Sequence, residues 1–335
     1  MRFQFSHRLD PAATFEGATR LRKLGLLNFR GDESGSYVLA KYSKRAYFRQ
    51  AWKVHPELTD FRGLVFNAET HEVVSVPFRK IFNYQENDAG STLTPDSLVT
   101  VHQKINGFLG VLTVFMKKHQ VLVSTTGTFD SEFAMRVRKH LELETEEQID
   151  EFFRKLVGWE SQQNCKLPDV LTFLFEIVDR DDPHIAPDEQ GAWLLGVQTT
   201  EDRNVFSGLP TDVTEFGKLL GYMIPVWSSV RWEDVLNIVK LWGFDAEGFV
   251  VYPTTEGPFK IKGKWYLSLK FLSRTKKNLE PYFTGQLFQQ WDEEIDQLVK
   301  LTNVPTYAQW SALSEGEKLN LLKAAAEKLC EHTWT

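Results

Sequence analysis

The chain has 335 residues, of which 42% are hydrophobic and 13% aromatic, so it can bury a full core in one large domain and a smaller one. Its formal net charge of −6, from 39 basic and 45 acidic residues, argues against a uniformly basic surface that coats nucleic acid, yet leaves room for a local cationic cleft. Because only Cys165 and Cys330 occur, we expect a reducing compartment and neither a disulfide framework nor a thiolate zinc site.

The N-terminus, MRFQFSHRLD, lacks the basic-then-apolar pattern of a signal peptide. No apolar run approaches the roughly 20 residues that are needed to span a bilayer. We therefore expect a cytoplasmic protein, or a nuclear one in a eukaryote, that acts as a monomer without a membrane.

Strand signals dominate from residue 60 to about 125. Five segments there are short, rich in β-branched and aromatic residues and separated by turn residues: GLVFN, EVVSVPF, SLVTVHQKI, FLGVLTVFM and QVLVSTT. They predict an antiparallel block. Inside it, Asn106-Gly107 lies between alternating hydrophobic residues and predicts the two-residue turn of a hairpin. In residues 131–158 apolar residues recur at helical spacing among many charges, which predicts a pair of solvated surface helices.

The second half of the chain begins with strand signals at residues 170–178 and 192–200, followed by helical patterns near 212–220 and 231–242. EGFVVYP and FKIKGKWYLSLKF then predict a last pair of strands, which ends at Phe271.

The last 60 or so residues carry two helical stripes and predict a small helical domain. A capping box from Ser314 to Glu317 opens the second stripe. We expect domain boundaries at 1–275 and 276–335. The stripes consist of Leu287, Trp291, Ile295 and Leu298, and of Leu319, Leu322, Ala326 and Leu329.

Six segments carry polar residues at unusual places along the chain. In order they are FRG (61–63), FRKIFN (78–83), KING (104–107), FEIV (175–178), EGFVVY (247–252) and KIKGKWYLSLK (260–270). Four of the six place a charge inside or at the edge of a strand-like segment, where a charge needs a partner or a function. If they converge on one cleft, they offer cations, carboxylates and a nucleophilic amine.

This set and its order resemble the covalent nucleotidyltransferases, and most closely the phage-type RNA ligase 1 family of ATP-dependent RNA end-joining enzymes, from about residue 60 to 270. In that family a Lys-x-Asp-Gly motif supplies the lysine that becomes adenylylated. One Lys-x-x-Gly is weak evidence, whereas six motifs in order are strong. The matching segments here are Arg62-Gly63, Lys80-Ile81-Phe82-Asn83, Lys104-Ile105-Asn106-Gly107, Phe175-Glu176, Glu247-Gly248-Phe249-Val250, and Lys260-Ile261-Lys262 with Tyr266.

The resemblance implies an α+β fold: a nucleotidyltransferase domain with the ATP-grasp-like antiparallel sheets of the DNA and RNA ligase superfamily, and a small all-α C-terminal domain. It implies that RNA 5′-phosphate and 3′-hydroxyl ends are joined through lysyl-AMP and adenylylated RNA, with ATP and Mg²⁺ or Mn²⁺ as cofactors. RNA repair, with tRNA as one candidate substrate, is the expected setting. A separate kinase and phosphatase would then heal the ends, because no such domain fits in this chain.

Lys104 is the expected nucleophile. A lysine attacks the α-phosphorus of ATP only when it is neutral, so its pKa must be lowered from about 10.4 by burial, cations or a metal ion. Lys260 and Lys262, which a spacing of two places on one face of a strand, are expected to contact the α-phosphate and the leaving pyrophosphate. An exposed strand face is the alternative for both.

The remaining roles also follow the resemblance. Glu247, with Asn106, is expected at the magnesium ion, which prefers oxygen ligands. Glu176 follows an apolar run and needs a donor such as the ribose hydroxyls. Arg62 is expected to bind the RNA 5′-phosphate. Gly107, Lys80, Phe82 and Tyr266 complete the nucleotide site. The alternatives are a structural ion pair for Arg62, a solvated strand edge for Glu247, and core packing for Phe82 and Tyr266.

Two departures from the family pattern stand out. Asn106 replaces the aspartate of Lys-x-Asp-Gly, a variant that resembles the adenylyltransferase domain of fungal-type tRNA ligases and removes a negative charge from the metal site. Thr126-Gly127 stands where the strand after the nucleophile often carries a lysine before a glycine, so that cation is absent or comes from elsewhere.

DNA ligases and mRNA capping enzymes are the rivals within the superfamily, and both append a β-rich OB domain. The 65 residues after Lys270 carry helical stripes instead, which favours RNA ligase. A noncatalytic nucleotide- or RNA-binding protein on the same scaffold is the alternative from another class, with Asn106 marking lost metal chemistry. Retention of Lys104 and Glu247 weighs against it.

Overall fold

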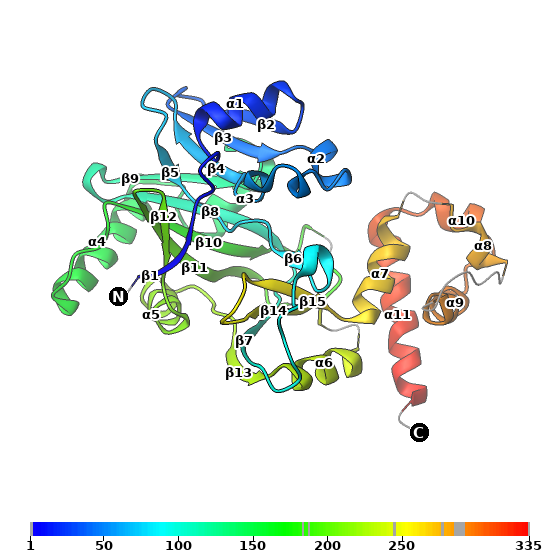
Figure 1. Ribbon diagram of the computed structural model, residues 1–335. Coiled ribbons are helices and arrows are strands. Elements are labelled where there is room, and N and C mark those ends of the chain that lie inside the picture. Colours follow the sequence, from blue (N-terminus) through cyan, green and yellow to red (C-terminus); the bar gives the residue numbers. More distant parts are fainter. Residues whose placement is uncertain are drawn as a thin grey trace. The chain divides into compact units, whose positions relative to one another are not determined.

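The structure is a computed structural model that describes residues 3–182, 184–186, 188–243, 246–275, 278–284 and 292–333. The chain divides into two compact units, and each is assembled from several stretches of sequence (Figure 1). The first comprises Met1–Ile81, Gly107–Val178 and Gln190–Pro225, and the second comprises Phe82–Asn106, Asp179–Glu189 and Val226–Thr335. Among the described residues, no helix combines the length and the apolar character that crossing a membrane requires.

The first unit contains a six-stranded sheet in the order β1-β12-β11-β10-β8-β9, with antiparallel neighbours throughout. The sequence predicted its central strands, because they are continuous β-rich runs. Their bounds are β1 Gln4–Arg8, β8 Phe108–Phe115, β9 Gln120–Thr125, β10 Val170–Val178, β11 Gly191–Glu201 and β12 Asn204–Ser207.

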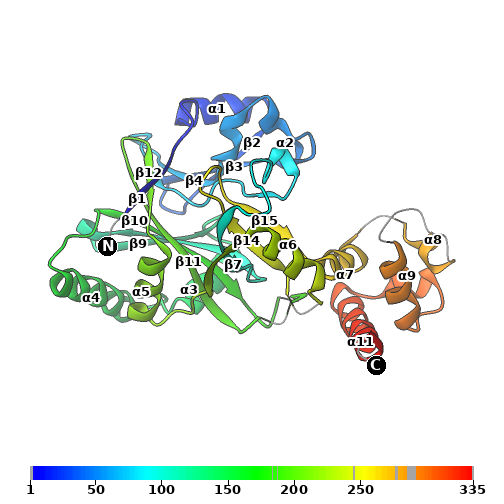
Figure 2. The ribbon, with the colours of Figure 1, turned by 60° about the horizontal axis from the view of Figure 1, so that its bottom comes forward.

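Three helices cover a face of this sheet and share one hydrophobic core with it. They are α3 (Glu132–His140), α4 (Glu146–Gln163) and α5 (Pro210–Leu220), and α4 and α5 lie side by side (Figure 2). The helices predicted for 131–158 are confirmed. They are amphipathic rather than wholly solvated, since Phe153 and Trp159 are buried, and Trp159 packs on Phe216 with ring centroids 5.0 Å apart.

A smaller antiparallel sheet completes the first unit, in the order β2-β3-β4-β5. Helix α1 precedes its first strand, and one short helix and two 3₁₀ turns connect β3 with β4. The bounds are α1 Phe15–Lys23, β2 Leu27–Gly31, β3 Tyr37–Tyr42, α2 Lys44–Phe48, η1 Ala51–Lys53, η2 Pro56–Thr59, β4 Arg62–Asn67 and β5 Val73–Ser75.

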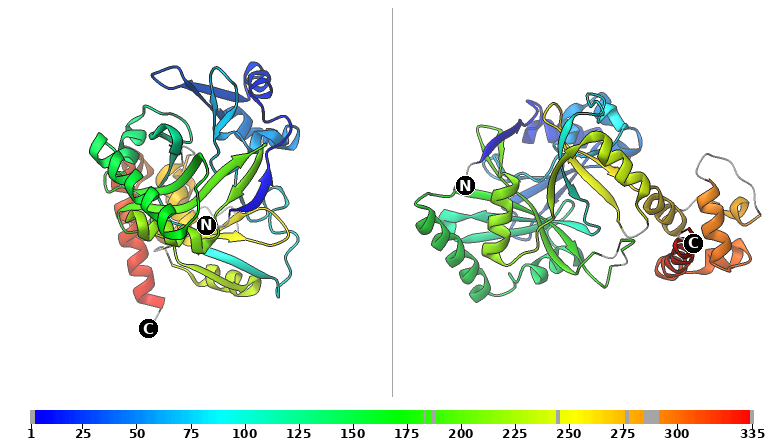
Figure 3. Two further views of the ribbon diagram at one scale, coloured as in Figure 1. Left: turned by 90° about the vertical axis from the view of Figure 1, so that its left-hand side faces the viewer. Right: turned by 90° about the horizontal axis from the view of Figure 1, so that it is seen from below.

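The second unit is built on a five-stranded sheet in the order β13-β7-β14-β15-β6, antiparallel except for the parallel pair β15 and β6. Helix α6 lies against this sheet (Figure 3). Its Trp232 and Val235 belong to the hydrophobic core that the sheet also lines. The bounds are β6 Phe82–Asn83, β7 Leu98–Gln103, β13 Trp227–Arg231, α6 Trp232–Leu241, β14 Gly248–Tyr252 and β15 Phe259–Lys262. The two units together confirm the predicted α+β class.

The hairpin predicted at Asn106-Gly107 is wrong. β7 pairs with β13 and β14, whereas β8 pairs with β9 and β10, so the segment passes from one sheet to another. Gly107 is required for a different reason than a turn: a Cβ there would lie 2.1 Å from the carbonyl oxygen of Ile177. Its glycine marks a close backbone approach.

The prediction of a strand through Phe271 is also wrong. β15 ends at Lys262, and α7 (Lys264–Arg274) follows. Aromatic and branched residues gave the segment a strand-like composition, but Tyr266, Leu269 and Leu272 recur every three residues and bury one helical face.

Helix α7 begins a helical core that also contains Ile185 and four later helices. They are α8 Glu280–Phe283, α9 Asp292–Leu301, α10 Tyr307–Ala312 and α11 Glu315–Thr333. The predicted helical C-terminal region is confirmed, whereas the boundary at residue 275 stays a prediction. Leu287 and Trp291 of the first predicted stripe lie outside the described residues.

Candidate active site

Lys104, Glu247 and Lys262 meet at neighbouring strand ends in the second unit. The backbone N–H of Lys104, just after β7, donates to the carbonyl of Gly248 at 2.8 Å, and Gly248 is in register with Lys262 on β15. The Glu247 carboxylate lies between two ammonium groups: Oε2 is 2.9 Å from Lys104 Nζ, and Oε1 is 2.5 Å from Lys262 Nζ. Three predicted site residues are therefore in direct contact.

This ion-pair cluster lies mostly out of solvent. Glu247 is 2% exposed, and the side chains of Lys104 and Lys262 are 20% and 12% exposed. Burial raises the pKa of the Glu247 carboxyl, but Lys104 and Lys262 outweigh burial and hold its pKa below the ordinary value. Glu247 therefore stays an anion at neutral pH. A Cβ at Gly248 would lie 1.9 Å from the Ile261 carbonyl oxygen, so only glycine lets β14 approach β15 this closely.

Asp188, which the sequence did not single out, supports the segment that carries Lys104. Its Oδ2 accepts the backbone N–H of Asn106 at 2.6 Å, and its Oδ1 accepts from Gln103 Nε2 at 3.3 Å. Burial and then the Glu247 charge raise the pKa of Asp188, against the Asn106 hydrogen bond and the Lys104 charge. A carboxylate thus lies near Lys104 even though Asn106 carries none.

The Asn106 side chain is buried and holds the same loop. With its amide oriented to satisfy its hydrogen bonds, the oxygen accepts the N–H groups of Ile185 and Ala186, both at 2.9 Å. In this orientation the amide nitrogen of Asn106 lies 3.3 Å from the Tyr266 hydroxyl oxygen. The metal role predicted for Asn106 stays a prediction, and its amide oxygen is engaged by backbone here.

Strand β15 presents its two lysines on one face, as predicted, because Phe259 and Ile261, which alternate with them, are buried in the core. Lys262 Nζ lies 5.1 Å from the centre of the Tyr266 ring, and Lys270 Nζ lies 5.7 Å from it.

Lys270 is a second residue that the sequence did not single out. Burial, with the charge of Lys262, lowers its pKa to about 8 against the attraction of Glu247. The signal was helical spacing: Lys270 follows Tyr266 by one turn, so the two share a face of α7.

Phe82, on β6, is half-buried and packs against the hydrophobic core of the second unit. Its predicted contact with a nucleotide stays a prediction.

Gly107 and Glu176 contact each other in the first unit. The Gly107 N–H donates to Glu176 Oε1 at 3.0 Å, and Glu176 is 8% exposed on β10. Lys80 is also 8% exposed in this unit, and its ammonium group lies 4.4 Å from the centre of the Trp52 ring and 5.8 Å from that of Tyr47. Its charge therefore lies among aromatic faces.

Arg62 opens β4 in the first unit and lies opposite Lys41 on β3. Both are half-buried.

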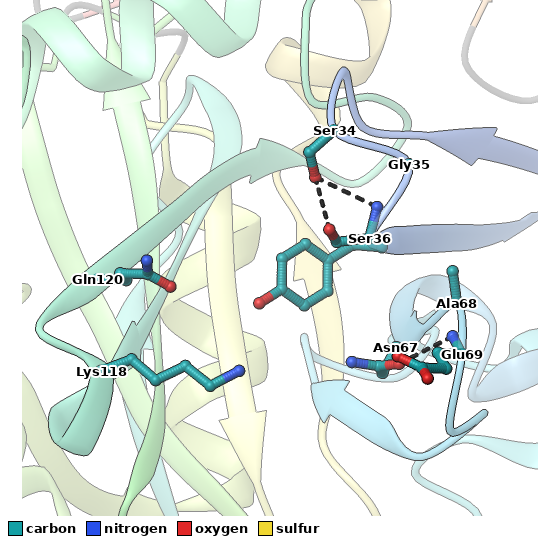
Figure 4. A pocket seen from close by; sticks show the side chains of 9 residues that line it. Ser34, Gly35, Ser36, Asn67, Ala68, Glu69, Lys118 and Gln120 are labelled. Carbon is teal, nitrogen blue, oxygen red and sulfur yellow. Dashed lines mark hydrogen bonds between the residues drawn. The ribbon is translucent and has the colours of Figure 1, made fainter.

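A polar pocket of about 700 Å³ lies elsewhere on the first unit (Figure 4). It is lined by residues 34–37 and 67–69 and by Lys118 and Gln120. None of the predicted site residues lines it, so it is distinct from the ion-pair cluster of Lys104.

Magnesium suits the oxygen ligands of the second unit. This ion is commonly held by one or two carboxylates, several waters and the substrate phosphates. Glu247 and Asp188 supply two carboxylates, and the Glu247 charge contributes to raising the pKa of Asp188. In the described part of the chain, no group of three or more His, Cys, Asp or Glu side chains could hold a metal by itself. The donor set therefore fits magnesium rather than a metal caged by protein.

A family model described as RNA ligase matches residues 60–274, more than half of the chain. Among solved structures, form 2 of an archaeal ATP-dependent RNA ligase is 17% identical, with a TM-score of 0.50 over 92% of this chain and 76% of that chain. Form 1 is 17% identical with the same coverage and a TM-score of 0.52. An RNA ligase of Naegleria gruberi, solved with PPi, is 12% identical over 56% of each chain, with a TM-score of 0.38.

No curated protein sequence matches the chain. At 17% identity the archaeal structures establish the shared fold. The family follows from the matched length, which runs from just before Arg62 to the end of α7 and includes every predicted motif. The chain belongs to the phage-type RNA ligase 1 family.

Proposed function

We propose that the protein is an ATP-dependent RNA ligase that joins RNA 5′-phosphate and 3′-hydroxyl ends through lysyl-AMP. The observation that carries the proposal is the contact of the Lys104 ammonium group with the Glu247 carboxylate, with Lys262 on the other carboxylate oxygen. A lysine beside an anion and a second cation, at a strand end, is suited to a phosphoryl substrate. The family and the archaeal ATP-dependent RNA ligases of the same fold support this reading.

The reaction has three displacements at phosphorus. Once its ammonium group has lost a proton, Lys104 Nζ forms an N–P bond to the α-phosphorus of ATP, the bond to the bridging oxygen breaks, pyrophosphate leaves, and the nitrogen gives up a second proton. A terminal oxygen of the RNA 5′-phosphate then displaces lysine from AMP, and the leaving nitrogen takes up a proton. The RNA 3′-hydroxyl attacks the activated 5′-phosphorus, its proton leaves, and AMP is released as the strand closes. Glu247, which accepts a hydrogen bond from Lys104 Nζ, holds that nitrogen in place before the first step.

The other side chains would neutralise charge on the phosphates and orient the nucleotide and the RNA end. Lys260 and Lys262 would contact the α-phosphate and the departing pyrophosphate, and Glu176 would accept from the ribose hydroxyls. Lys80, Phe82, Gly107 and Tyr266 would complete the nucleotide site, and Arg62 would bind the RNA 5′-phosphate.

Glu247 and Asp188, with Asn106 as predicted from the sequence, are the residues that would hold magnesium. The bound ion, Mg²⁺ or Mn²⁺, would neutralise charge on the phosphates. Both carboxylates also keep their contacts with the segment at Lys104, so they would link the ion to the nucleophile.

RNA repair is the setting that this chemistry serves, and a cleaved tRNA is one substrate with suitable ends. If the breaks carry cyclic phosphates, a separate kinase and phosphatase would prepare them. We place the enzyme in the cytoplasm, or the nucleus of a eukaryote, as a monomer, in keeping with its low cysteine content.

Labelled ATP tests the proposal. Incubation with [α-³²P]ATP and magnesium, followed by denaturing electrophoresis, is expected to leave label on the wild type and none on Lys104→Ala. No covalent label, or label that survives in Lys104→Ala, would sink the ligase proposal. 5′-Phosphorylated RNA and DNA with matched 3′ ends are then compared. Preferential sealing of DNA would make the protein a DNA ligase, and binding of either without sealing would make it a noncatalytic binding protein.

A further inference from the structure

Two cations, Lys41 and Arg62, face each other across neighbouring strands of the first unit. They are paired across the antiparallel strands β3 and β4, next to a shift in register between Ala40 and Lys41. Opposite residues in such a pair lie on one face of the sheet, with Cβ atoms about 5 Å apart, and like charges at these positions are destabilising. The arrangement therefore costs stability in the absence of an anion.

The pKa of Lys41 reflects the same repulsion. Burial lowers its pKa from the ordinary value, and the Arg62 charge lowers it further. Within the described residues, neither side chain has a carboxylate as an ion-pair or hydrogen-bond partner. In the part of the chain that the structure describes, two half-buried positive charges are thus kept together without a paired carboxylate.

The turn after β9 lies beside Lys41 and Arg62. Lys41 Nζ donates to Thr126 Oγ1 at 3.0 Å, and a hydroxyl orients the ammonium group without neutralising it. Next to Thr126, Gly127 leaves its side-chain position open, 3.4 Å from Lys41 Nζ. Gly63, beside Arg62, has φ +100°, and a Cβ there would lie 2.9 Å from Thr126 Cα. Gly63 therefore allows β4 to approach Thr126 closely, and Gly127 places no side chain beside the Lys41 ammonium group.

We propose that Lys41, Arg62 and Thr126 form a binding site for a phosphoryl group. This inference rests on the proposed function, which supplies two sources of that group, the phosphates of ATP and the 5′-phosphate of RNA. It adds Lys41 and Thr126 to the site, with the lysine as a point charge beside the planar fork of the arginine.

Stability in inorganic pyrophosphate provides a readout that needs no catalysis. Pyrophosphate is expected to raise the unfolding midpoint of the wild-type full-length chain, and to raise that of Lys41→Gln by less than half as much, because the contacts proposed for Lys260 and Lys262 remain. Without ligand, Lys41→Gln is expected to be at least as stable as the wild type, because the like-charge contact is gone. A matched control is Lys139→Gln, which removes an exposed lysine of α3 and should respond as the wild type does.

One kinetic and one binding measurement identify the source of the phosphoryl group. If the site takes ATP, Lys41→Gln raises the KM for ATP in lysyl-AMP formation about tenfold or more, the loss expected for a hydrogen bond to a charged group. If it takes RNA, the variant loses its preference for 5′-phosphorylated over 5′-hydroxyl RNA in a binding assay without ATP. Lys41→Arg is expected to retain the function in either case.

The inference is overturned if the pyrophosphate shift, the KM for ATP and the 5′-phosphate preference of Lys41→Gln all stay within twofold of the wild-type values. It is equally overturned if Lys139→Gln reproduces the losses. Failure of the wild type to form lysyl-AMP refutes the proposed function instead, and the pyrophosphate measurement still decides whether the anion site exists.

A second surface of the first unit carries an independent inference. Residues 44–54, which form α2, η1 and their flanks, contain four cations and no acidic residue in a chain of net charge −6. Exposed apolar side chains alternate with them: Tyr47 is 47% exposed, Phe48 78% and Val54 77%. The four cations, Lys44, Arg45, Arg49 and Lys53, are also exposed.

Contacts with buried Trp52 and with Lys80 hold the Tyr47 ring of this surface in place. Tyr47 packs edge-on against buried Trp52 at 5.9 Å and against Phe48 at 5.6 Å between ring centroids. Lys80 lies under both Trp52 and Tyr47. A held aromatic platform among lysines and arginines is the combination that binds single-stranded nucleic acid, through base stacking and phosphate contacts.

The geometry points to a docking surface for single-stranded RNA at residues 44–54, which also rests on the proposed function. Charge complementarity selects the polyanion, and the exposed Phe48 ring offers a face on which a base can stack. Tyr47 is left out of the test because it contacts Lys80, a residue of the proposed nucleotide site.

Fluorescence anisotropy with a labelled single-stranded RNA measures this docking on the full-length chain. Phe48→Ala is expected to weaken binding at least about fivefold. Lys44→Gln with Arg49→Gln should flatten the slope of log affinity against log salt by about 1.4, which is two single-strand phosphate contacts. The control, Lys139→Gln with Lys218→Gln, removes two exposed lysines from α3 and α5 and should change neither.

Lysyl-AMP formation from ATP alone should be unchanged in these surface variants. Wild-type protein that does not bind RNA, unchanged affinity in Phe48→Ala, or an equal slope change in the control pair each overturns the inference. Self-association in sedimentation that Phe48→Ala abolishes would instead make the surface an interface between copies of the chain, and would also overturn it. Loss of lysyl-AMP in the wild type counts against the proposed function alone.

Discussion

Lys104 Nζ and Glu247 Oε2 lie 2.9 Å apart, although 143 residues separate them in the chain. The contact forms because β7 and β14 pair side by side, which places the residue after one strand beside the residue before the other. Lys262 binds the second oxygen of the same carboxylate. One buried anion therefore holds two cations, and the nucleophile proposed here is one of them.

Replacing Glu247 with glutamine should destabilise the protein by about 3 kcal/mol, because breaking a buried ion pair from one side leaves its partner charges uncompensated. Urea unfolding of Glu247→Gln measures the change. Glu201→Gln, at an exposed position on β11, is the matched control and should lie within about 0.5 kcal/mol of the wild type. An unchanged midpoint for Glu247→Gln would show that the two lysines are held apart by other means.

Gly107→Ala should unfold the first unit more easily, by about 2 kcal/mol or more, because its Cβ would overlap the Ile177 carbonyl oxygen. Gly158→Ala provides the contrast, since Gly158 lies inside α4 with nothing within 4 Å of its added Cβ. There the substitution should stabilise by about 0.5–1 kcal/mol through helix propensity. Equal effects at both positions in thermal unfolding would refute the close approach at Gly107.

Asp188→Ala should slow lysyl-AMP formation by between about 10- and 100-fold, because Asn106 and Gln103 lose the acceptor that fixes the segment around Lys104. The loss should fall on kcat more than on the KM for ATP. Asp181→Ala serves as control, since Asp181 is an exposed aspartate of the same connection. A wild-type kcat in Asp188→Ala would remove its positioning role.

Acid should destabilise the fold between pH 6.5 and about 4 through half-buried His7 and buried His102. Burial, with the Arg79 charge, lowers the pKa of His7 to about 4, and burial, with the Lys104 charge, lowers that of His102 to about 4 against its hydrogen bond to the Gln103 carbonyl. Unfolded histidines take up protons in this window while the folded ones do not, so stability falls as pH falls.

Urea midpoints measured across this pH range test the assignment. The variant His7→Asn with His102→Asn should show a shallower decline than the wild type. The same slope in both proteins would place the acid sensitivity in other groups.

Much of the candidate site was readable from the sequence because its signals are local. The alternation of β15 put Lys260 and Lys262 on one face, and Glu247 stood out as an acidic residue before Gly248 on an otherwise apolar strand. The helices at 131–158 and the strand at 170–178 followed from periodicity. The strand predicted through Phe271 was wrong because the segment after Gly263 combines residue types typical of strands with the spacing of a helix.

The sequence by itself determined the fold class and the chemical inventory, a lysine, carboxylates and cations in the order of an RNA ligase, since residue types and periodicities are fixed by the chain. Only the tertiary structure decided which groups meet. It sent β7 and β8 into separate sheets and brought Asp188 to Asn106 across 82 residues. It also put the Lys41 ammonium group 3.0 Å from the Thr126 hydroxyl, where the sequence had left a cation unassigned. Strand pairing and loop packing set these contacts, and they depend on the free energy of the whole fold rather than on any local pattern.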